Sequence, residues 1–97
     1  MFKKEIGFRL RVLRYGSGSE RIRDFAKVLK VNEDRYDKWE KGVSSIPAEE
    51  VQRLKKKFGI TADWLYFGDE LELHSKTVAM IRDGEAKAQE PRKGKAA

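Results

Sequence analysis

The sequence predicts an all-α protein, and three observations carry this prediction. Apolar residues recur every three or four positions in successive segments, which is the spacing of the buried stripe of an amphipathic helix. Glycine, proline and capping residues separate these segments and supply start and stop signals. The length of 97 residues is enough for one modest hydrophobic core and too short for two. We therefore expect one domain of five helices over residues 1–70, an extension over 71–83 and a flexible tail over 84–97.

The first two expected helices cover residues 4–15 and about 20–30. The glycine-rich run at residues 16–18 ends the first, and Ser19 is the expected N-cap of the second. Their apolar faces comprise Ile6, Leu10 and Leu13 in the first helix and Ile22, Phe25, Ala26 and Leu29 in the second.

A third, short helix is expected over residues 33–41. Asn32 is a good N-cap, and the two acidic residues after it favour the positive end of the helix dipole. Tyr36 and Trp39 lie three residues apart and therefore share a face, which we expect to be buried. Gly42 suits the C′ position beyond the helix.

Two further helices complete the expected domain. Ser45 or Ile46 caps the fourth, and Pro47 fits its first turn. Thr61 caps the fifth, over residues 62–67. The buried stripe of the fourth helix comprises Val51, Leu54 and Phe58.

The helical signal weakens after Gly68. Residues 75–82 suit one or two further helical turns, with Val78 and Ile81 as their apolar side. From Gly84 onward no large apolar residue follows, so this segment cannot offset the entropy of its own ordering. We therefore expect it to be mobile.

The segment from Phe25 to Gly42 resembles the helix-turn-helix of the Cro and phage-repressor family, often called the xenobiotic response element family. The likeness lies in a large apolar residue followed by alanine, a turn with valine, a polar cap and a closing Trp-Glu-Lys-Gly. Residues 6–14 look like the first helix of that family, and residues 59–68 look like its fifth. The resemblance covers residues 6–69 and implies a five-helix, phage-repressor-like DNA-binding domain.

The physical basis of such a pair of helices is visible in the sequence. Two helices cross steeply over a tight turn only if a small residue lies at the crossing, and Ala26 supplies it. The third helix then protrudes far enough to enter a major groove. The apolar side chains expected to fill the wedge are Phe25, Leu29, Val31 and Tyr36.

The resemblance implies a sequence-specific transcriptional regulator, most simply a repressor, that binds double-stranded DNA as a homodimer on a palindromic operator. It also implies an ion pair between Arg14 and Glu40 that orients the third helix. The expected base contacts are Glu33, Asp34, Asp37 and Lys38. The expected phosphate contacts are Arg11, Arg21, Arg23, Arg35 and Lys41. The expected dimer surface comprises Trp64, Tyr66, Phe67, Leu71 and Leu73.

The reading helix departs from the family pattern, because it places three carboxylates where Gln, Arg, Ser, Thr or Lys is usual. A carboxylate accepts a hydrogen bond from the cytosine amino group, but it also repels phosphates. A second hypothesis therefore stays open: a degenerate helix-turn-helix that binds a protein, such as an anti-activator or an antitoxin-like partner.

The start of the second helix departs as well. Ile22 stands where the family often has a glutamine that contacts phosphate, and we expect Ile22 to pack in the core instead. Arg21, Arg23 or a backbone N–H at the helix start would then replace the lost donor.

The charge of the chain favours a polyanionic partner. Its net charge is +6, and residues 1–41 hold 12 Lys and Arg against 7 Asp and Glu, a net +5. Residues 42–70 hold 4 against 5, a net −1. The excess therefore lies on the first three expected helices, which suits nucleic acid, although charge also serves solubility alone.

Composition argues against several other classes of protein. With no cysteine and one histidine, His74, the chain can form neither a thiolate metal site nor a histidine-based zinc site, and we expect no metal and no cofactor. It has no nucleophile and base at a suggestive spacing and no glycine-rich phosphate loop, so we do not expect an enzyme. No apolar run has the length of a membrane span or a signal peptide, and the expected location is cytoplasmic.

Overall fold

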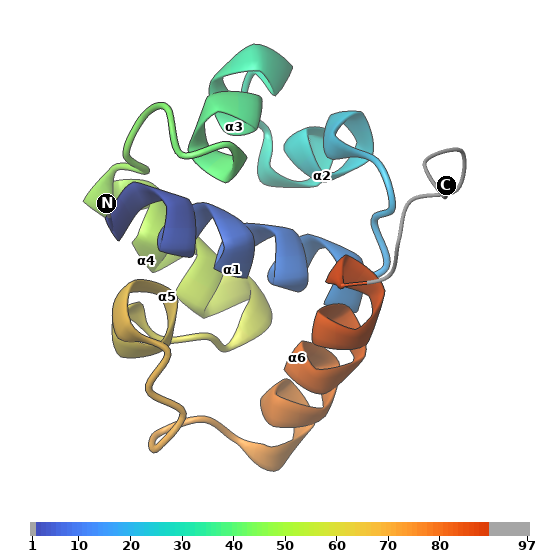
Figure 1. Cartoon of the computed structure of the whole chain (residues 1–97), viewed down its shortest axis with the longest axis vertical. Helices are drawn as coiled ribbons and strands as arrows, with labels where there is room; N and C mark the ends of the chain where they lie inside the picture. The colour runs from blue at the N-terminus through green and yellow to red at the C-terminus, as the bar shows by residue number, and fades with distance from the viewer. Residues whose placement is uncertain (1, 90–97) are drawn as a thin grey trace.

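Helix α1 runs through the middle of the molecule, and α3, α5 and α6 pack directly against it (Figure 1). The structure is a computed structural model and describes residues 2–89. Helix α2 packs on α3, and α4 packs on α5. The described residues form six α-helices and no β-strand: α1 (Phe2–Gly16), α2 (Ile22–Leu29), α3 (Glu33–Glu40), α4 (Ala48–Phe58), α5 (Ala62–Phe67) and α6 (Ser75–Ala88).

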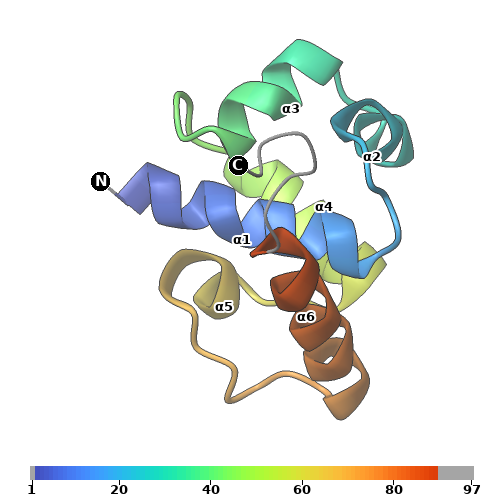
Figure 2. The same cartoon turned by 45° about the vertical axis from the view of Figure 1, so that its right-hand side comes forward.

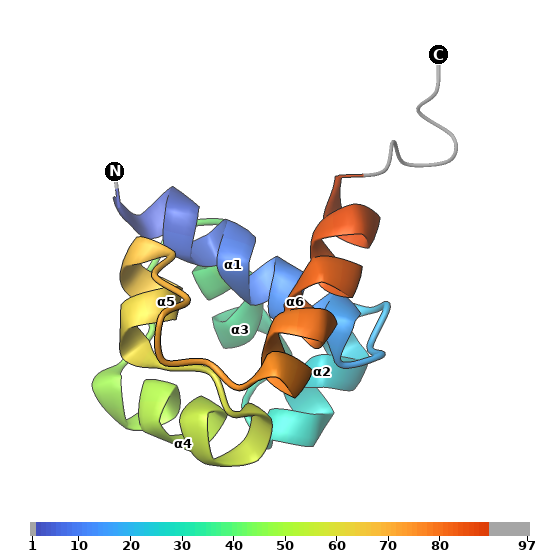
Figure 3. The ribbon, with the colours of Figure 1, turned by 90° about the horizontal axis from the view of Figure 1, so that it is seen from below.

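The helices form two groups around α1. Helices α2 and α3 lie together on one side and α5 lies on the other, while α4 passes behind α1 (Figures 1 and 2). Seen from below, α5 lies beside the N-terminal half of α1, and α6 crosses its C-terminal half (Figure 3). None of the helices within residues 2–89 has the length and apolarity that crossing a membrane requires.

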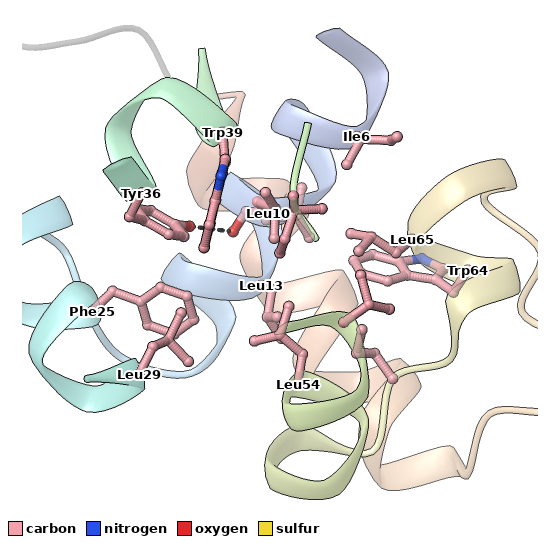
Figure 4. Packing of buried hydrophobic residues seen from close by; sticks show 14 of the residues in the cluster. Ile6, Leu10, Leu13, Phe25, Leu29, Tyr36, Trp39, Leu54, Trp64 and Leu65 are labelled. Carbon is pink, nitrogen blue, oxygen red and sulfur yellow. Dashed lines mark hydrogen bonds between the residues drawn. The ribbon is translucent and has the colours of Figure 1, made fainter. Parts of the chain in front are cut away.

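One hydrophobic core joins both groups, and α1 supplies its centre through Leu10 and Leu13, which are fully buried. Phe25 and Tyr36 cover one side of this pair, and Leu54 and other residues of α4 and α5 cover the other (Figure 4). The structure confirms the prediction that Tyr36 and Trp39 share a buried face of α3, since both are at most 2% exposed.

The sequence located several helix ends correctly. The Asn32 side chain accepts a hydrogen bond from the Arg35 N–H at 3.0 Å, and Thr61 accepts one from the Trp64 N–H at 3.0 Å. Gly42 follows α3 with a φ of +77°, a left-handed conformation that glycine adopts without strain.

Two expected caps were wrong. The N-cap of α2 is Arg21, whose side chain does not cap the helix, and Ser19 lies further back, where its N–H donates to Arg14 O. The N-cap of α4 is Pro47, so neither Ser45 nor Ile46 holds that position. In the first case the buried Arg14 donates a hydrogen bond to the Glu20 carbonyl in the loop just before α2.

The C-terminal part of the described chain is more ordered than expected. The prediction ended the last helix near Arg82 and made everything from Gly84 mobile, whereas α6 continues to Ala88 and packs along α1. A Cβ at Gly84 would collide with the carbonyl oxygen of Val12, so the missing side chain is what allows the two backbones to meet. The rest of the predicted tail, residues 90–97, lies outside the described residues.

Candidate nucleic-acid interface

A turn of three residues, 30–32, joins α2 to α3 and sets the angle between them. Lys30 has a φ of +59°, and the Val31 N–H donates to Ala26 O at 3.0 Å. Ala26 is 2% exposed, as the small residue expected at the crossing. The rings of Phe25 and Tyr36 meet edge to face, with centroids 5.4 Å apart, and fill the wedge between the helices.

The ion pair expected between Arg14 and Glu40 joins α1 to the end of α3. Arg14 Nε lies 2.7 Å from Glu40 Oε2, Arg14 Nη2 lies 3.1 Å from Oε1, and both side chains are almost fully buried. The Tyr36 hydroxyl donates to Glu40 Oε2 at 2.7 Å. Both carboxylate oxygens are therefore satisfied, and the inner face of α3 has one fixed position on α1.

The buried network changes the proton affinity of its members. Burial, followed by the charge of Glu40 and the hydrogen bond to it, raises the pKa of Tyr36 well above its ordinary value. Burial by itself would lower the pKa of Arg14, but the hydrogen bond and charge of Glu40 outweigh it and raise that pKa. Arg14 is therefore charged and Tyr36 neutral at physiological pH.

Close backbone packing adds to the ion pair. A Cβ at Gly7 would collide with the carbonyl oxygen of Glu40, so α1 and the last turn of α3 approach closely at this glycine. Arg14 also donates from Nη1 to the carbonyl of Glu20 at 2.6 Å, which fixes the loop that leads into α2. One buried guanidinium thus positions both helices of the pair.

The outer face of α3 carries the residues that were expected to touch bases. Glu33, Asp34 and Lys38 are exposed, and Asp37 is partly exposed and bonded to Lys41 at 2.9 Å. All four project from a helix of eight residues whose inner face is buried. The structure places them where a ligand outside the molecule can reach them.

The expected phosphate-contacting residues are spread around α3. Arg21 and Arg23 are exposed at the start of α2, although Arg21 also approaches Asp24 at 3.5 Å. The Arg35 guanidinium lies 5.2 Å from the centre of the Trp39 ring, which holds it against the helix. Arg11 is partly buried on α1, outside the α2–α3 pair. Ile22 is partly buried against the core, as expected.

Comparison with known proteins does not identify a function for this chain. No protein-family model, curated protein or solved structure matches this chain. The part of the chain that the structure describes also holds no group of three or more His, Cys, Asp or Glu side chains arranged to bind a metal.

The expected dimer surface is partly wrong. Trp64 is 2% exposed, because its ring fills the core beneath α5 and cannot reach a partner. Tyr66 and Leu73 are partly buried against the core. Phe67 and Leu71 are 64% and 84% exposed, and they remain available for contact with another molecule.

Two arginines donate hydrogen bonds to the last carbonyl groups of other helices, and the sequence did not predict these contacts. Arg9 donates from Nη1 to the carbonyls of Leu65 at 3.0 Å and Tyr66 at 3.2 Å, which satisfies the end of α5. Arg53 donates to the Leu29 carbonyl at the end of α2. Arg9 is 56 residues from Leu65 in the sequence, so no local pattern could have revealed the pairing.

Proposed function

We propose that this chain binds double-stranded DNA through α2, the turn and α3, as a sequence-specific transcriptional regulator, most simply a repressor. It acts as a homodimer on a palindromic operator, because one copy covers only a few base pairs. The observation that carries the proposal is the division of α3 into two faces. Its inner face is locked by the buried network around Glu40, and its outer face is exposed.

A rigid, protruding helix is what major-groove recognition requires. In this proposal the exposed polar side chains of α3 would contact base edges, and the buried network around Glu40 would hold the helix in one orientation before DNA binds. Arg21 and Arg23 at the start of α2 would contact the phosphates beside the groove. In this proposal α3 reads the sequence and α2 sets the register.

The charge of the pair of helices offsets the carboxylates of α3. Residues 21–41 hold 7 Lys and Arg, and 5 Asp and Glu of which Glu40 is neutralised by Arg14, so the balance is 7 against 4, or +3. The surrounding cations attract phosphate, while Glu33 and Asp34 would accept hydrogen bonds from cytosine amino groups. In such a site the surrounding cations supply affinity for DNA, and the carboxylates of α3 supply base specificity.

A salt titration of duplex affinity tests the proposal. The logarithm of the association constant should fall linearly with the logarithm of salt concentration. Replacing Arg21 and Arg23 by Gln should lower the slope by roughly 2 and weaken binding to all duplexes. The control, with Lys55 on α4 and Lys76 on α6 replaced by Gln, changes net charge equally and should leave the slope unchanged. Equal slopes for the two variants would contradict the proposal.

The carboxylates of α3 also support a second candidate function, in which this face binds a basic surface of another protein. Glu33 and Asp34 are exposed on adjacent positions, and Asp37 lies one turn further along the same helix. Charge reversal separates the two candidates. Under the first, replacing Arg21, Arg23 and Lys38 by Glu abolishes duplex binding. Under the second, the unaltered chain binds no duplex, and replacing Glu33 and Asp34 by Lys abolishes binding to the protein partner.

A further inference from the structure

A hollow of about 380 Å³ lies between α4 and α5. The two helices are joined by the short segment 59–61 and lie side by side (Figure 3). Small-molecule sites in proteins have volumes of about 300–1,000 Å³, so the hollow has room for a small ligand. All its lining residues come from these two helices: Ala48, Val51, Gln52, Lys55, Ala62 and Tyr66.

The lining residues of α4 form one stripe along that helix. Counted from Ala48, they occupy positions i, i+3, i+4 and i+7, which share a face. Val51 is buried against the core, whereas Ala48, Gln52 and Lys55 are exposed. This stripe therefore borders the hollow and is only partly covered by the rest of the described chain.

Two alanines leave the space between the helices open. Ala48 and Ala62 are both exposed, and they line the hollow from α4 and from α5. A longer apolar side chain at either position would occupy part of the volume. Together with Val51 and the ring of Tyr66, the alanines make most of the lining apolar, as is usual for a small-molecule site.

The two ends of the hollow differ in chemistry. Lys55 lies two helical turns from Ala48, which is about 10 Å along α4. Tyr66 lies beside the start of α4, because it also lines a second hollow together with two residues of the segment before that helix, Ser45 and Ile46. The hollow thus has an ammonium group at one end and an aromatic ring at the other.

The charge at the Lys55 end favours an anion. Lys55 is the one charged side chain that lines the hollow, and it forms no ion pair within residues 2–89. Gln52, one turn earlier on the same face, supplies a second N–H donor. Asp63 is exposed on α5 but does not line the hollow. A carboxylate would accept hydrogen bonds from both donors, and the bond from the ammonium group would be charge-assisted.

We propose that this hollow binds a small aromatic carboxylate. The carboxylate contacts Lys55 and Gln52, and the aromatic ring packs against Tyr66. A ring and a carboxylate joined by a short linker match the two ends of the hollow in chemistry and in spacing. The site uses no residue of α2 or α3, so it is independent of the proposed binding to DNA.

Titration of the full chain with three probes of similar shape, followed by the amide NMR signals, tests the site. Addition of 3-phenylpropionate should shift the signals of residues 48–55 and 62–66 in a saturable way. The neutral 3-phenylpropionamide and the cationic 3-phenylpropylamine keep the ring, and they should bind at least about tenfold more weakly because they lose the charge-assisted bond. Equal affinity for the three probes, or no saturable shift with the carboxylate, overturns the proposal.

Two variants with matched controls test the two ends of the site. Lys55→Gln should raise the dissociation constant of the carboxylate about tenfold. Lys56→Gln removes the same charge from a residue outside the lining, and it should change the constant by less than about twofold. Ala48→Leu should fill the hollow and abolish saturable binding, whereas Ala86→Leu, at an exposed position of α6, should not.

The amide spectrum of each variant shows whether it is folded. Equal effects of Lys55→Gln and Lys56→Gln, or unchanged binding by a folded Ala48→Leu variant, overturn the proposal. Signals of residues 48–55 that move when the unliganded chain is diluted would show that a second copy covers the hollow, and this result would overturn it as well.

Discussion

Helices α3 and α6 both pack against α1, but different contacts hold them. Helix α3 is fixed by a buried ion pair, a tyrosine hydroxyl and large aromatic rings. Both helices approach α1 closely at glycines, α3 at Gly7 and α6 at Gly16 and Gly84, where a Cβ would collide with a backbone carbonyl. Helix α6 adds apolar contacts such as the fully buried Ile81, whereas α3 adds the polar network. Directional polar contacts fix an orientation, whereas small residues fix only a distance. A helix that recognises a ligand needs directional polar contacts, because its orientation must be fixed.

Removing the buried carboxylate should have the largest effect. Glu40→Ala leaves the Arg14 charge buried without its partner, so we expect a loss of about 3–5 kcal/mol in the free energy of unfolding. Asp37→Ala is the control, because it removes an exposed ion pair from the same helix and should cost less than about 1 kcal/mol. Urea denaturation measures both. Similar losses would mean that the buried network does not anchor α3.

Adding a side chain at Gly84, where α6 meets α1, should have the second largest effect on stability. On helix propensity alone Gly84→Ala would stabilise α6 by about 1 kcal/mol, but the collision with Val12 O should make the change destabilising by about 1–3 kcal/mol. The sign of the change in the free energy of unfolding shows whether helix propensity or the collision dominates. Ala86→Ser, at an exposed position of the same helix, should alter stability by less than about 0.5 kcal/mol.

Alkaline pH should weaken the α3 anchor through Tyr36. Its pKa is raised in the folded protein, so its contribution to stability is complete below the unfolded pKa of about 10 and is lost as the pH rises toward the folded value. The free energy of unfolding should fall by up to about 1.4 kcal/mol per pH unit in that range. The Tyr36→Phe variant should show a shallower decline between pH 10 and 11. Parallel curves would exclude Tyr36 as the source.

The smallest expected change is a gain at the turn between α2 and α3. Lys30 has a φ of +59°, where glycine has no steric penalty, so Lys30→Gly should stabilise the protein by up to about 1 kcal/mol. Lys27→Gly, three residues earlier inside α2, should destabilise it by about 1 kcal/mol. Thermal unfolding would show the opposite signs. A loss at both positions would contradict the argument.

The comparison also explains which parts of the fold the sequence could predict. Helix α3 can be predicted from a local cap, Asn32, and from two aromatic residues at helical spacing. Its ion pair was expected from a resemblance rather than from spacing, because Arg14 and Glu40 lie 26 residues apart. Local patterns report helices, and they do not report which helices touch.

Helix α6 shows the limit of such patterns. Gly84 and the alanines after it were interpreted as a mobile segment because they bury little apolar surface, yet small size is what lets α6 approach α1. Trp64 was expected at a dimer surface and lies in the core instead. Periodicity shows that a side chain faces another part of the molecule or a partner, and only packing shows which. The structure is needed to recognise glycines whose missing side chain permits close packing, and side chains that bond segments far apart in the sequence.

The most direct test of the central claim is selection of duplexes that the chain binds from a random pool. We expect enrichment of an inverted repeat, with base preferences that change when Glu33→Gln and Asp34→Asn are introduced together and persist in the Lys55→Gln control. Enrichment should weaken as salt rises. A pool that shows no enrichment at any salt concentration, with the chain folded and dimeric, would contradict the claim that α3 reads DNA.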